Sequence, residues 1–468
     1  MERAMFPSKT FMLAFLLAIG AGSLRASEPM SPLAPAPGAR EAIHAQVADG
    51  FRAAGENDLH IGVVLPLSGA FDYYGQSALT GLLTRLEAEN RAGGVRGRRL
   101  APIIIDDGGD PDKTFWAIDA LTRQPERRVT VVIGPILTLC LTPRLAALVR
   151  ERECILLTPS ASLDHLEQDG EPWVFNVGMR GEEQAQAMAR FMVGSHGARK
   201  AGVLYDRRYL SSIVMAERFA QAFADMGGEV AASLSMALPY DAESKVDYAQ
   251  PHRELEEALD QLADHAIDIL YMPMYAQEVN AAVMAIGRRQ EAVGERSRSS
   301  FWGAPGEIAE RMAEMAALRE NRPAGARPLS RRLNLCGPDS WDIQSVYDGA
   351  GWRLVGSVIS SALLDRYARN DSYHRFLQAM FEAGVDIPDS MLVGAHDAAT
   401  LAIECLKAGW TGSAAVLALR DTERPFALAT GNVRMTATGE TTKTVQIRVV
   451  ELLDGWPAPR YAAGGRGP

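Results

Sequence analysis

The stretch from Leu59 to about Thr114 constrains the fold more than any other part of this sequence. It reads as a short apolar strand, a glycine-containing loop, an amphipathic helix, a second apolar strand and an acidic turn. Two apolar strands that flank one helix predict a parallel βαβ unit. Because open parallel sheets bind ligands beyond the carboxyl ends of their strands, a binding site is expected in the loops that follow these strands.

Length and composition favour a globular protein with two lobes. The chain has 468 residues, too many for one ordinary hydrophobic core. Its 47% hydrophobic and 23% charged residues are typical of folded domains, so long disordered regions are not expected. The formal net charge of −10 argues against nucleic acid as the main partner.

The first residues have the pattern of a secretory signal peptide. Arg3 and Lys9 precede the apolar run 11–21, and small residues follow it. We predict a signal peptide over residues 1–26, because the run is too short for a permanent membrane span; a buried N-terminal helix is the alternative. No later stretch approaches 18 unbroken apolar residues, so the mature chain is expected not to insert into a membrane.

From His60 onward, apolar strands alternate with amphipathic helices in two successive series. This alternation predicts two doubly wound α/β lobes with parallel sheets. Strands are expected at 60–67, 100–106, 129–136, 154–158, 201–205, 229–235, 267–274, 333–337, 431–435 and 445–452. Helices are expected at 76–90, 111–122, 142–150, 182–193, 211–226, 252–262, 276–288, 373–383 and 391–408. Thr142 followed by Pro143 is a good helix start, a capping hydroxyl before a proline at the first helical position.

Residues 287–332 interrupt this alternation. They contain ten arginines, six glutamates and no lysine, a net charge of +4 within an acidic protein. We interpret them as a surface insertion with one helix at 307–318. A docking surface for an acidic partner is the alternative.

Short motifs between residues 66 and 111 resemble the opening of the branched-chain amino-acid-binding proteins, the type I periplasmic solute-binding family. The resemblance extends over roughly residues 59–453, and it is the ordered spacing of the motifs that makes it specific. The motifs are Pro66-Leu67-Ser68-Gly69, Tyr74-Gly75-Gln76, Asn90 with Gly93-Gly94-Val95, Gly97-Arg98, and Asp106-Asp107 with Asp110-Pro111.

The resemblance implies two α/β lobes joined by a hinge of three crossover strands, which close on a small ligand. It also implies a periplasmic protein that presents an amino acid or a related small carboxylate to the permease complex of an ABC importer. The implied boundaries are 59–178 plus about 358–425 for lobe 1 and 179–357 plus about 426–455 for lobe 2. The same division makes residues 27–58 a flexible lead-in, with a short helix at 41–54, and residues 456–468 a tail.

An amino acid presents two charges, and a receptor must satisfy both. Its carboxylate needs hydroxyl and backbone N–H donors, and its ammonium needs a carboxylate. Thr138 resembles the family position where a serine contacts the ligand carboxylate. The loop Thr158-Pro159-Ser160-Ala161-Ser162 resembles a second half of the clamp, with Ser160 and Ser162 as contacts. Ordinary turn capping is the alternative for all three residues.

Asp339 falls where the family has an acidic residue that pairs with the ligand's ammonium, if residues 287–332 are skipped as an insertion. Helix N-capping is the alternative for Asp339. A competing alignment through 301–305 puts proline at the acidic position and implies a ligand without an amino group. By the same resemblance, Tyr74 lies beside the ligand, Tyr275 lines the cleft and Tyr209 matches an aromatic residue at the lobe–lobe face. All three are counted as ligand-binding residues, with half-buried packing as the alternative.

Departures from the family leave the ligand open. Asp339 is one methylene shorter than the usual glutamate, and an apolar or aromatic-acid pocket lined by Leu137, Trp302 and Trp341 is an alternative. The family's disulfide is missing, because its two positions hold Gly109 and Leu137. The four cysteines allow three pairings in an oxidising compartment, of which Cys140–Cys154 is the most local, or they remain free buried thiols.

Enzyme signatures are missing from the sequence. It contains no GxSxG, HExxH or GxxxxGK[ST] motif and no GxGxxG after the first strand. We therefore expect a binding protein without a cofactor rather than an enzyme. Asp106, Asp107 and Asp110 are interpreted as a helix-capping turn rather than a metal site. The alternative function is a ligand-sensing or accessory periplasmic subunit that acts through protein contacts, with residues 287–332 as its docking surface.

Overall fold

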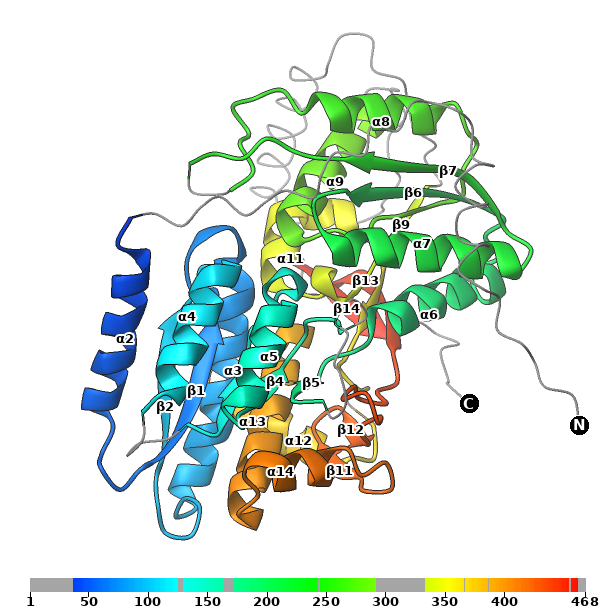
Figure 1. Ribbon diagram of the computed structural model, residues 1–468. Helices are drawn as coiled ribbons and strands as arrows, with labels where there is room; N and C mark the ends of the chain where they lie inside the picture. Colours follow the sequence, from blue (N-terminus) through cyan, green and yellow to red (C-terminus); the bar gives the residue numbers. More distant parts are fainter. Residues whose placement is uncertain are drawn as a thin grey trace, which may run out of the picture. The chain divides into compact units, whose positions relative to one another are not determined.

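The computed structural model describes residues 37–124, 129–163, 166, 172–242, 245–291, 333–365, 367–385, 387–453 and 456–461. Within these ranges the chain forms two α/β lobes, each built on its own sheet (Figure 1). The predicted fold class is therefore confirmed. The predicted signal peptide and most of the arginine-rich insertion lie outside the described residues.

The first lobe contains a five-stranded parallel sheet in the order β2-β1-β3-β4-β5. Its strands are β1 (Leu59–Leu65), β2 (Leu100–Asp106), β3 (Val131–Ile133), β4 (Ile155–Thr158) and β5 (Val174–Asn176). Every residue of β3 and β4 is buried, as expected for central parallel strands with helices on both faces.

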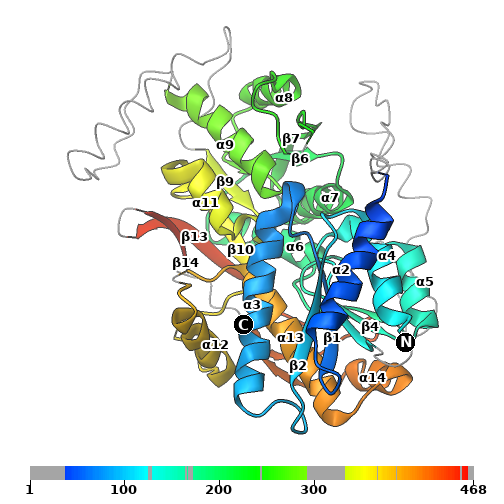
Figure 2. The same ribbon diagram turned by 90° about the vertical axis from the view of Figure 1, so that its left-hand side faces the viewer.

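The helices of this lobe cover its sheet, and α3 packs against α13 while α4 packs against α2 and α5 (Figure 2). They are α2 (Ala39–Ala53), α3 (Asp72–Arg91), α4 (Pro111–Thr122), α5 (Pro143–Glu151), α12 (Asp371–Glu382), α13 (Ser390–Ala408) and α14 (Gly412–Leu419), with the short 3₁₀ helices η1 (Gly69–Phe71) and η2 (Thr138–Cys140). A two-stranded sheet of β11 (Phe426–Leu428) and β12 (Gly431–Val433) lies beside α12 and α13.

The second lobe contains a seven-stranded mixed sheet in the order β14-β13-β10-β9-β8-β6-β7. Among the described strands of this sheet, β13 runs antiparallel to β10 and to β14, and the remaining neighbours run parallel. The strands are β6 (Lys200–Asp206), β7 (Glu229–Met236), β8 (Ile269–Tyr271), β9 (Asn334–Gly337), β10 (Val358–Ser361), β13 (Gln446–Leu453) and β14 (Trp456–Tyr461). The helices are α6 (Gly181–Gly194), α7 (Leu210–Asp225), α8 (Arg253–Ala263), α9 (Ala276–Glu291), η3 (Asp339–Trp341), α11 (Gln344–Ala350) and η4 (Gly351–Leu354).

Local sequence signals explain where several helices begin. The Asp110 side chain caps α4 by accepting hydrogen bonds from the N–H groups of Asp112 and Lys113, both at 2.9 Å. The Thr142 hydroxyl caps α5 by accepting from the Leu145 N–H at 3.2 Å, with Pro143 at the first helical position. Both helix starts were predicted from the sequence, and the structure confirms them.

The structure differs from the expected boundaries at four places. Strand β11 pairs with β12 and packs against α12 and α13 of the first lobe, although residues from about 426 onward were expected in lobe 2. Strand β10 belongs to the second sheet, although residue 358 was expected to open the return to lobe 1. Strand β14 pairs with β13, although residues 456–461 were expected in a tail. Helix α2 packs on the first lobe through Ile43, Val47 and Phe51, so the lead-in is structured from residue 39 onward.

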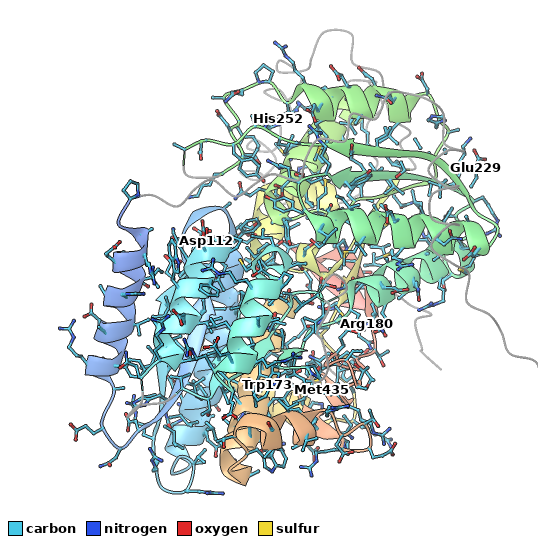
Figure 3. All side chains as sticks on the ribbon, in the orientation of Figure 1. Asp112, Trp173, Arg180, Glu229, His252 and Met435 are labelled. Atoms are coloured by element: carbon cyan, nitrogen blue, oxygen red, sulfur yellow. The ribbon has the colours of Figure 1, made fainter. Side chains whose placement is uncertain are left out.

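Three crossovers connect the lobes, after β5, after β10 and after β12. Arg180 lies on the first crossover, near the junction of the lobes in Figure 3. Its guanidinium is 3.2 Å from the Glu440 carboxylate on the third crossover. The Thr441 hydroxyl donates to the Gly178 carbonyl at 2.6 Å. The first and third crossovers are therefore joined side by side.

Candidate functional site

Residues from both lobes surround a cavity of about 70 Å³. Nearly all of its wall comes from segments that directly follow parallel strands, at the edge where sheets of this kind bind ligands. These segments are 136–138 after β3, 160 and 162 after β4, 179–184 after β5, 210–215 after β6, 273–275 after β8 and 338–340 after β9. Six of the seven predicted site residues line this cavity, namely Tyr74, Thr138, Ser160, Ser162, Tyr275 and Asp339.

The two hydroxyl-bearing loops of lobe 1 are held together on one side of the cavity. The Thr138 hydroxyl oxygen accepts a hydrogen bond from the Ser162 backbone N–H at 3.1 Å. No acceptor for the Thr138 O–H hydrogen is found among the described residues, so this hydrogen is available for an oxygen in the cavity. The loop at Ser160 offers a second hydroxyl beside it.

Thr158 positions these loops, and sequence reasoning missed that role. Its hydroxyl donates to the Pro135 carbonyl at 2.6 Å and accepts from the Ala161 N–H at 2.9 Å. A threonine at the end of a buried strand, followed by proline and serine, is the pattern of a local side-chain turn and could have signalled this. Thr158 thus holds the two loops in fixed register.

Across the cavity, Asp339 lies at the end of β9 in lobe 2 and is half-buried. The cap residue of η3 is Pro338, and no side chain caps this helix, so the helix-capping alternative for Asp339 is wrong. Burial, with a smaller contribution from the nearby Asp342 carboxylate, raises the pKa of Asp339 to about 7, against an opposing hydrogen bond from Gln184. No lysine, arginine or histidine lines the cavity, and none pairs with Asp339 among the described residues.

The rest of the wall is mostly apolar. It combines branched aliphatic side chains with four methionines, all within reach of the same space. These residues are Ile136, Leu137, Met179, Leu210, Val214, Met215, Met274 and Met391. A ligand with one polar end and one aliphatic end would match such a lining.

Tyr74 joins the lobes directly. Its hydroxyl donates to the Ser340 carbonyl at 2.7 Å and accepts from the Ala276 N–H at 3.2 Å. Both partners belong to lobe 2, whereas Tyr74 lies on α3 of lobe 1. The next residue, Gly75, must be a glycine, because a Cβ at this position would lie 1.9 Å from the Pro66 carbonyl oxygen. Tyr74 is therefore both a wall of the cavity and a contact that holds the lobes together.

Tyr209 is the predicted site residue that the structure does not bring to the cavity. Its ring packs edge-on against Phe71 of lobe 1 and Tyr275 of lobe 2, with centroids 5.9 and 4.9 Å away. Its hydroxyl is 3.2 Å from that of Tyr240. Tyr209 thus lies on the face where the lobes touch, beside the site.

Of the residues considered for an aromatic pocket, one lines the cavity and one lies outside its lining. Leu137 lines the cavity, and a Cβ on Gly109 would lie 2.8 Å from its side chain, so leucine occupies the space where the family has its disulfide. Trp341 is fully buried and donates its indole N–H to the Met272 carbonyl at 3.0 Å, outside the lining. Trp302 and the competing alignment through 301–305 lie outside the described residues.

The acidic turn after β2 is held by hydrogen bonds, and Asp110 caps α4 as predicted. The Asp106 carboxylate accepts from the N–H groups of Leu67 and Gly108, at 2.8 and 2.9 Å, and Asp107 accepts from the Thr114 hydroxyl at 2.7 Å. Within the described ranges no group of three or more His, Cys, Asp or Glu side chains is arranged to hold a metal ion. The four cysteines are free and buried, which settles the choice between pairing and free thiols.

Comparisons with known proteins agree with this architecture. Residues 58–289 match the family described as periplasmic binding protein. A Leu/Ile/Val-binding protein homolog from Brucella melitensis is 28% identical over 158 residues, 34% of this chain and 42% of the relative. BraC3, a Leu/Ile/Val-binding protein from Rhizobium johnstonii, is 23% identical over 150 residues, 32% of this chain and 40% of the relative. The chain spans less than half the length of these curated relatives.

Solved structures extend the likeness of fold over most of the chain. The branched-chain amino acid substrate-binding protein LivJ from Streptococcus pneumoniae, in complex with isoleucine, has a TM-score of 0.65 at 17% identity, covering 86% of this chain and 99% of LivJ. A solute-binding protein of an ABC transporter from Rhodopseudomonas palustris, in complex with 3,4-dihydroxybenzoic acid, has a TM-score of 0.65 at 16% identity, covering 87% and 97%.

In the part of the chain that the structure describes, no helix has the length and apolar character needed to cross a membrane. The two lobes and the family match agree with the fold class and the resemblance expected from the amino-acid sequence. Residues 58–289 match the periplasmic binding protein family, and the two-lobed fold around them is that of the type I periplasmic solute-binding proteins.

Proposed function

We propose that the protein is the periplasmic substrate-binding component of an ABC importer and that it captures an α-amino acid with an apolar side chain by closure of its lobes. The observation that carries the proposal is the placement of Asp339 across one cavity from the hydroxyls of Thr138 and Ser160. These groups match an ammonium and a carboxylate on one small molecule. The proposal assigns binding and no chemical step to the chain.

Charge favours an amino acid over a carboxylic acid without an amino group. Asp339 is the only acid or base of the lining apart from tyrosine hydroxyls. A benzoate-like anion would bring a second negative charge into a cavity without a cation, and one of the two would have to take up a proton. A zwitterion satisfies Asp339 and the lobe 1 hydroxyls together. The methionine-rich wall then receives the aliphatic side chain.

The alternative role as an accessory subunit depended on the arginine-rich segment, which lies almost wholly outside the described residues. No feature of the described lobes favours that role over ligand capture. The importer's permease remains part of the proposal, since it follows from the family match.

The test compares L-leucine, 4-methylpentanoate and 4-hydroxybenzoate by isothermal titration calorimetry. 4-Methylpentanoate is leucine without its ammonium. We expect leucine to bind with a Kd of roughly micromolar, about −8 kcal/mol, and at least about tenfold more tightly than the two carboxylic acids. Asp339→Asn and Thr138→Val should each weaken leucine binding at least about tenfold.

Asp225→Asn is the matched control, because Asp225 is an exposed carboxylate at the end of α7 in the same lobe as Asp339. It should bind leucine like the wild type. If 4-hydroxybenzoate binds more tightly than leucine, the amino-acid assignment is wrong. If both site variants keep full affinity for leucine, the cavity is not the binding site.

A further inference from the structure

We infer that Gln184 is a positioning residue that fixes the Asp339 carboxylate for the ligand's ammonium and connects it to the hinge. This inference rests on the proposed function and names a residue that the sequence analysis did not consider. Gln184 lies on α6, directly after the first crossover, and is only 3% exposed. It lines the same cavity as Asp339.

The orientation of the Gln184 amide is fixed by its partners. Its oxygen accepts from the Asp339 backbone N–H at 2.9 Å and from the Ser360 hydroxyl at 2.7 Å. A backbone N–H can only donate, so the atom that faces it must be the amide oxygen. The amide NH₂ group is then the donor that remains, and the Gln184 side chain lowers the pKa of the Asp339 carboxyl, which favours its ionised form.

This contact acts on the charge of Asp339 as well as on its position. Burial favours the neutral carboxyl, and the Gln184 hydrogen bond is the largest influence that favours the ionised form. The other titratable groups that face Asp339 are Asp342, Tyr74, Tyr271 and Tyr275, none of which is a cation. Gln184 therefore stabilises the ionised Asp339 carboxylate, as a basic residue could. Unlike a basic residue, it carries no positive charge that would compete with the ligand's ammonium for Asp339.

The same amide connects the ligand end of the cavity to two crossovers. Gln184 follows the first crossover, and Ser360 is the next-to-last residue of strand β10, which precedes the second crossover. Because one oxygen holds both Asp339 and Ser360, a shift of the Asp339 loop on binding an ammonium moves groups at both crossovers. A ligand without an ammonium makes no ion pair with Asp339 and would not shift this loop. Recognition of the ammonium and closure of the lobes are thereby coupled.

The experiment compares Gln184→Met and Ser360→Ala with the wild type. Methionine keeps the length of the side chain but removes both the acceptor and the donor. Alanine at 360 removes one donor to the amide oxygen and leaves the rest. Gln186→Met is the matched control, because Gln186 lies on the same helix and donates to Glu182 at 3.0 Å instead of to Asp339.

Two readouts are needed. The first is the ratio of the Kd values of 4-methylpentanoate and L-leucine, which we expect to fall roughly tenfold in Gln184→Met, to fall less in Ser360→Ala and to stay unchanged in Gln186→Met. The second is the titration of the Asp339 carboxyl in the protein without added ligand, followed by carbon NMR and assigned with Asp339→Asn. Its midpoint should rise by about one pH unit in Gln184→Met.

The second readout does not depend on the ligand. If no amino acid binds to the wild type but the midpoint rises in Gln184→Met, the proposed function fails and the positioning role stands. If leucine binds as proposed but Gln184→Met leaves both the Kd ratio and the midpoint at wild-type values, the positioning role is overturned. Circular dichroism melting curves of each variant identify any loss that is due to unfolding.

Discussion

Replacing Asp397 with asparagine tests the attachment of the hinge to lobe 1. Asp397 is fully buried on α13, and its carboxylate is 3.0 Å from the ammonium of Lys443, which is on the third crossover and almost fully buried. The same carboxylate accepts from the Ala429 N–H at 2.7 Å and from the Thr430 hydroxyl. Asp397→Asn keeps the size of the side chain but leaves the Lys443 ammonium buried without its counter-ion.

The structure sets the size of the effect. Burial alone would raise the pKa of Asp397, but the Lys443 charge and several hydrogen bonds overcome it and lower the pKa from 3.8 to about 2. A shift of roughly two units corresponds to about 2–3 kcal/mol of native-state stabilisation. Loss of one partner of a buried pair typically costs about 3–5 kcal/mol. We therefore expect Asp397→Asn to lower the free energy of unfolding by about 2–5 kcal/mol at pH 7.

The effect should depend on pH in one direction. Because the pKa of Asp397 is lower in the folded protein than in the unfolded chain, its contribution is complete above pH about 4 and is lost as the pH falls towards 2. Urea denaturation of the wild type and of Asp397→Asn should thus converge at acidic pH.

The control for this prediction is Glu404→Gln, an exposed carboxylate on the same helix, which should change the free energy of unfolding by less than about 0.5 kcal/mol. Lys443→Met combined with Asp397→Asn gives the coupling energy of the pair. A loss below about 1 kcal/mol in Asp397→Asn at pH 7 would show that the buried pair does not hold the crossover.

Two further predictions concern Tyr74 at the face between the lobes and the buried Glu278 of lobe 2. Tyr74→Phe removes the hydroxyl that bridges to Ser340 and Ala276, and should disfavour the closed arrangement of the lobes by about 1–3 kcal/mol. Small-angle X-ray scattering should then show a larger radius of gyration for the variant than for the wild type. An unchanged scattering curve would contradict the bridging role. Burial and the nearby Asp206 raise the pKa of Glu278 to about 7, so its ionisation destabilises the folded protein increasingly as the pH rises from 4.5 towards 7. Glu278→Gln should therefore raise the melting temperature at pH 8 but not at pH 4.5, and an equal rise at both would refute this.

Sequence patterns predicted the central strands and the helices that begin with a clear cap. Strands β1, β2 and β4 are apolar and long enough to stand out, and Asp110 and Thr142 mark the helices that follow. Strand β10 was missed because half of it is serine. Its serines are buried because Ser360 bonds Gln184 and Ser361 donates to Asp342 at 2.5 Å, and neither partner is near in the sequence.

The candidate site also contains residues that the sequence identified and residues that it did not. Thr138, Ser160 and Asp339 were identified because each follows a predicted strand at a family position, and the structure brings them to one cavity. Their contact with a ligand remains a prediction. Gln184 gave no local signal, since its partner Asp339 is 155 residues away. Tyr209 was matched to the lobe–lobe face, where the structure has it, but was also counted among the ligand contacts, because sequence cannot separate that face from the cavity beside it.

The four methionines of the cavity wall set how finely the protein can discriminate. A methionine side chain has three rotatable bonds and a polarizable sulfur, so it adapts its shape to whatever lies against it. One methylene is worth about 1–3 kcal/mol, roughly 10–200-fold, in a rigid pocket, and aliphatic ligands that differ by one methylene should differ in affinity by less than this in the methionine-lined cavity. We expect the protein to bind ligands with different aliphatic side chains but to require the same charged groups in each, so that one protein binds several related solutes.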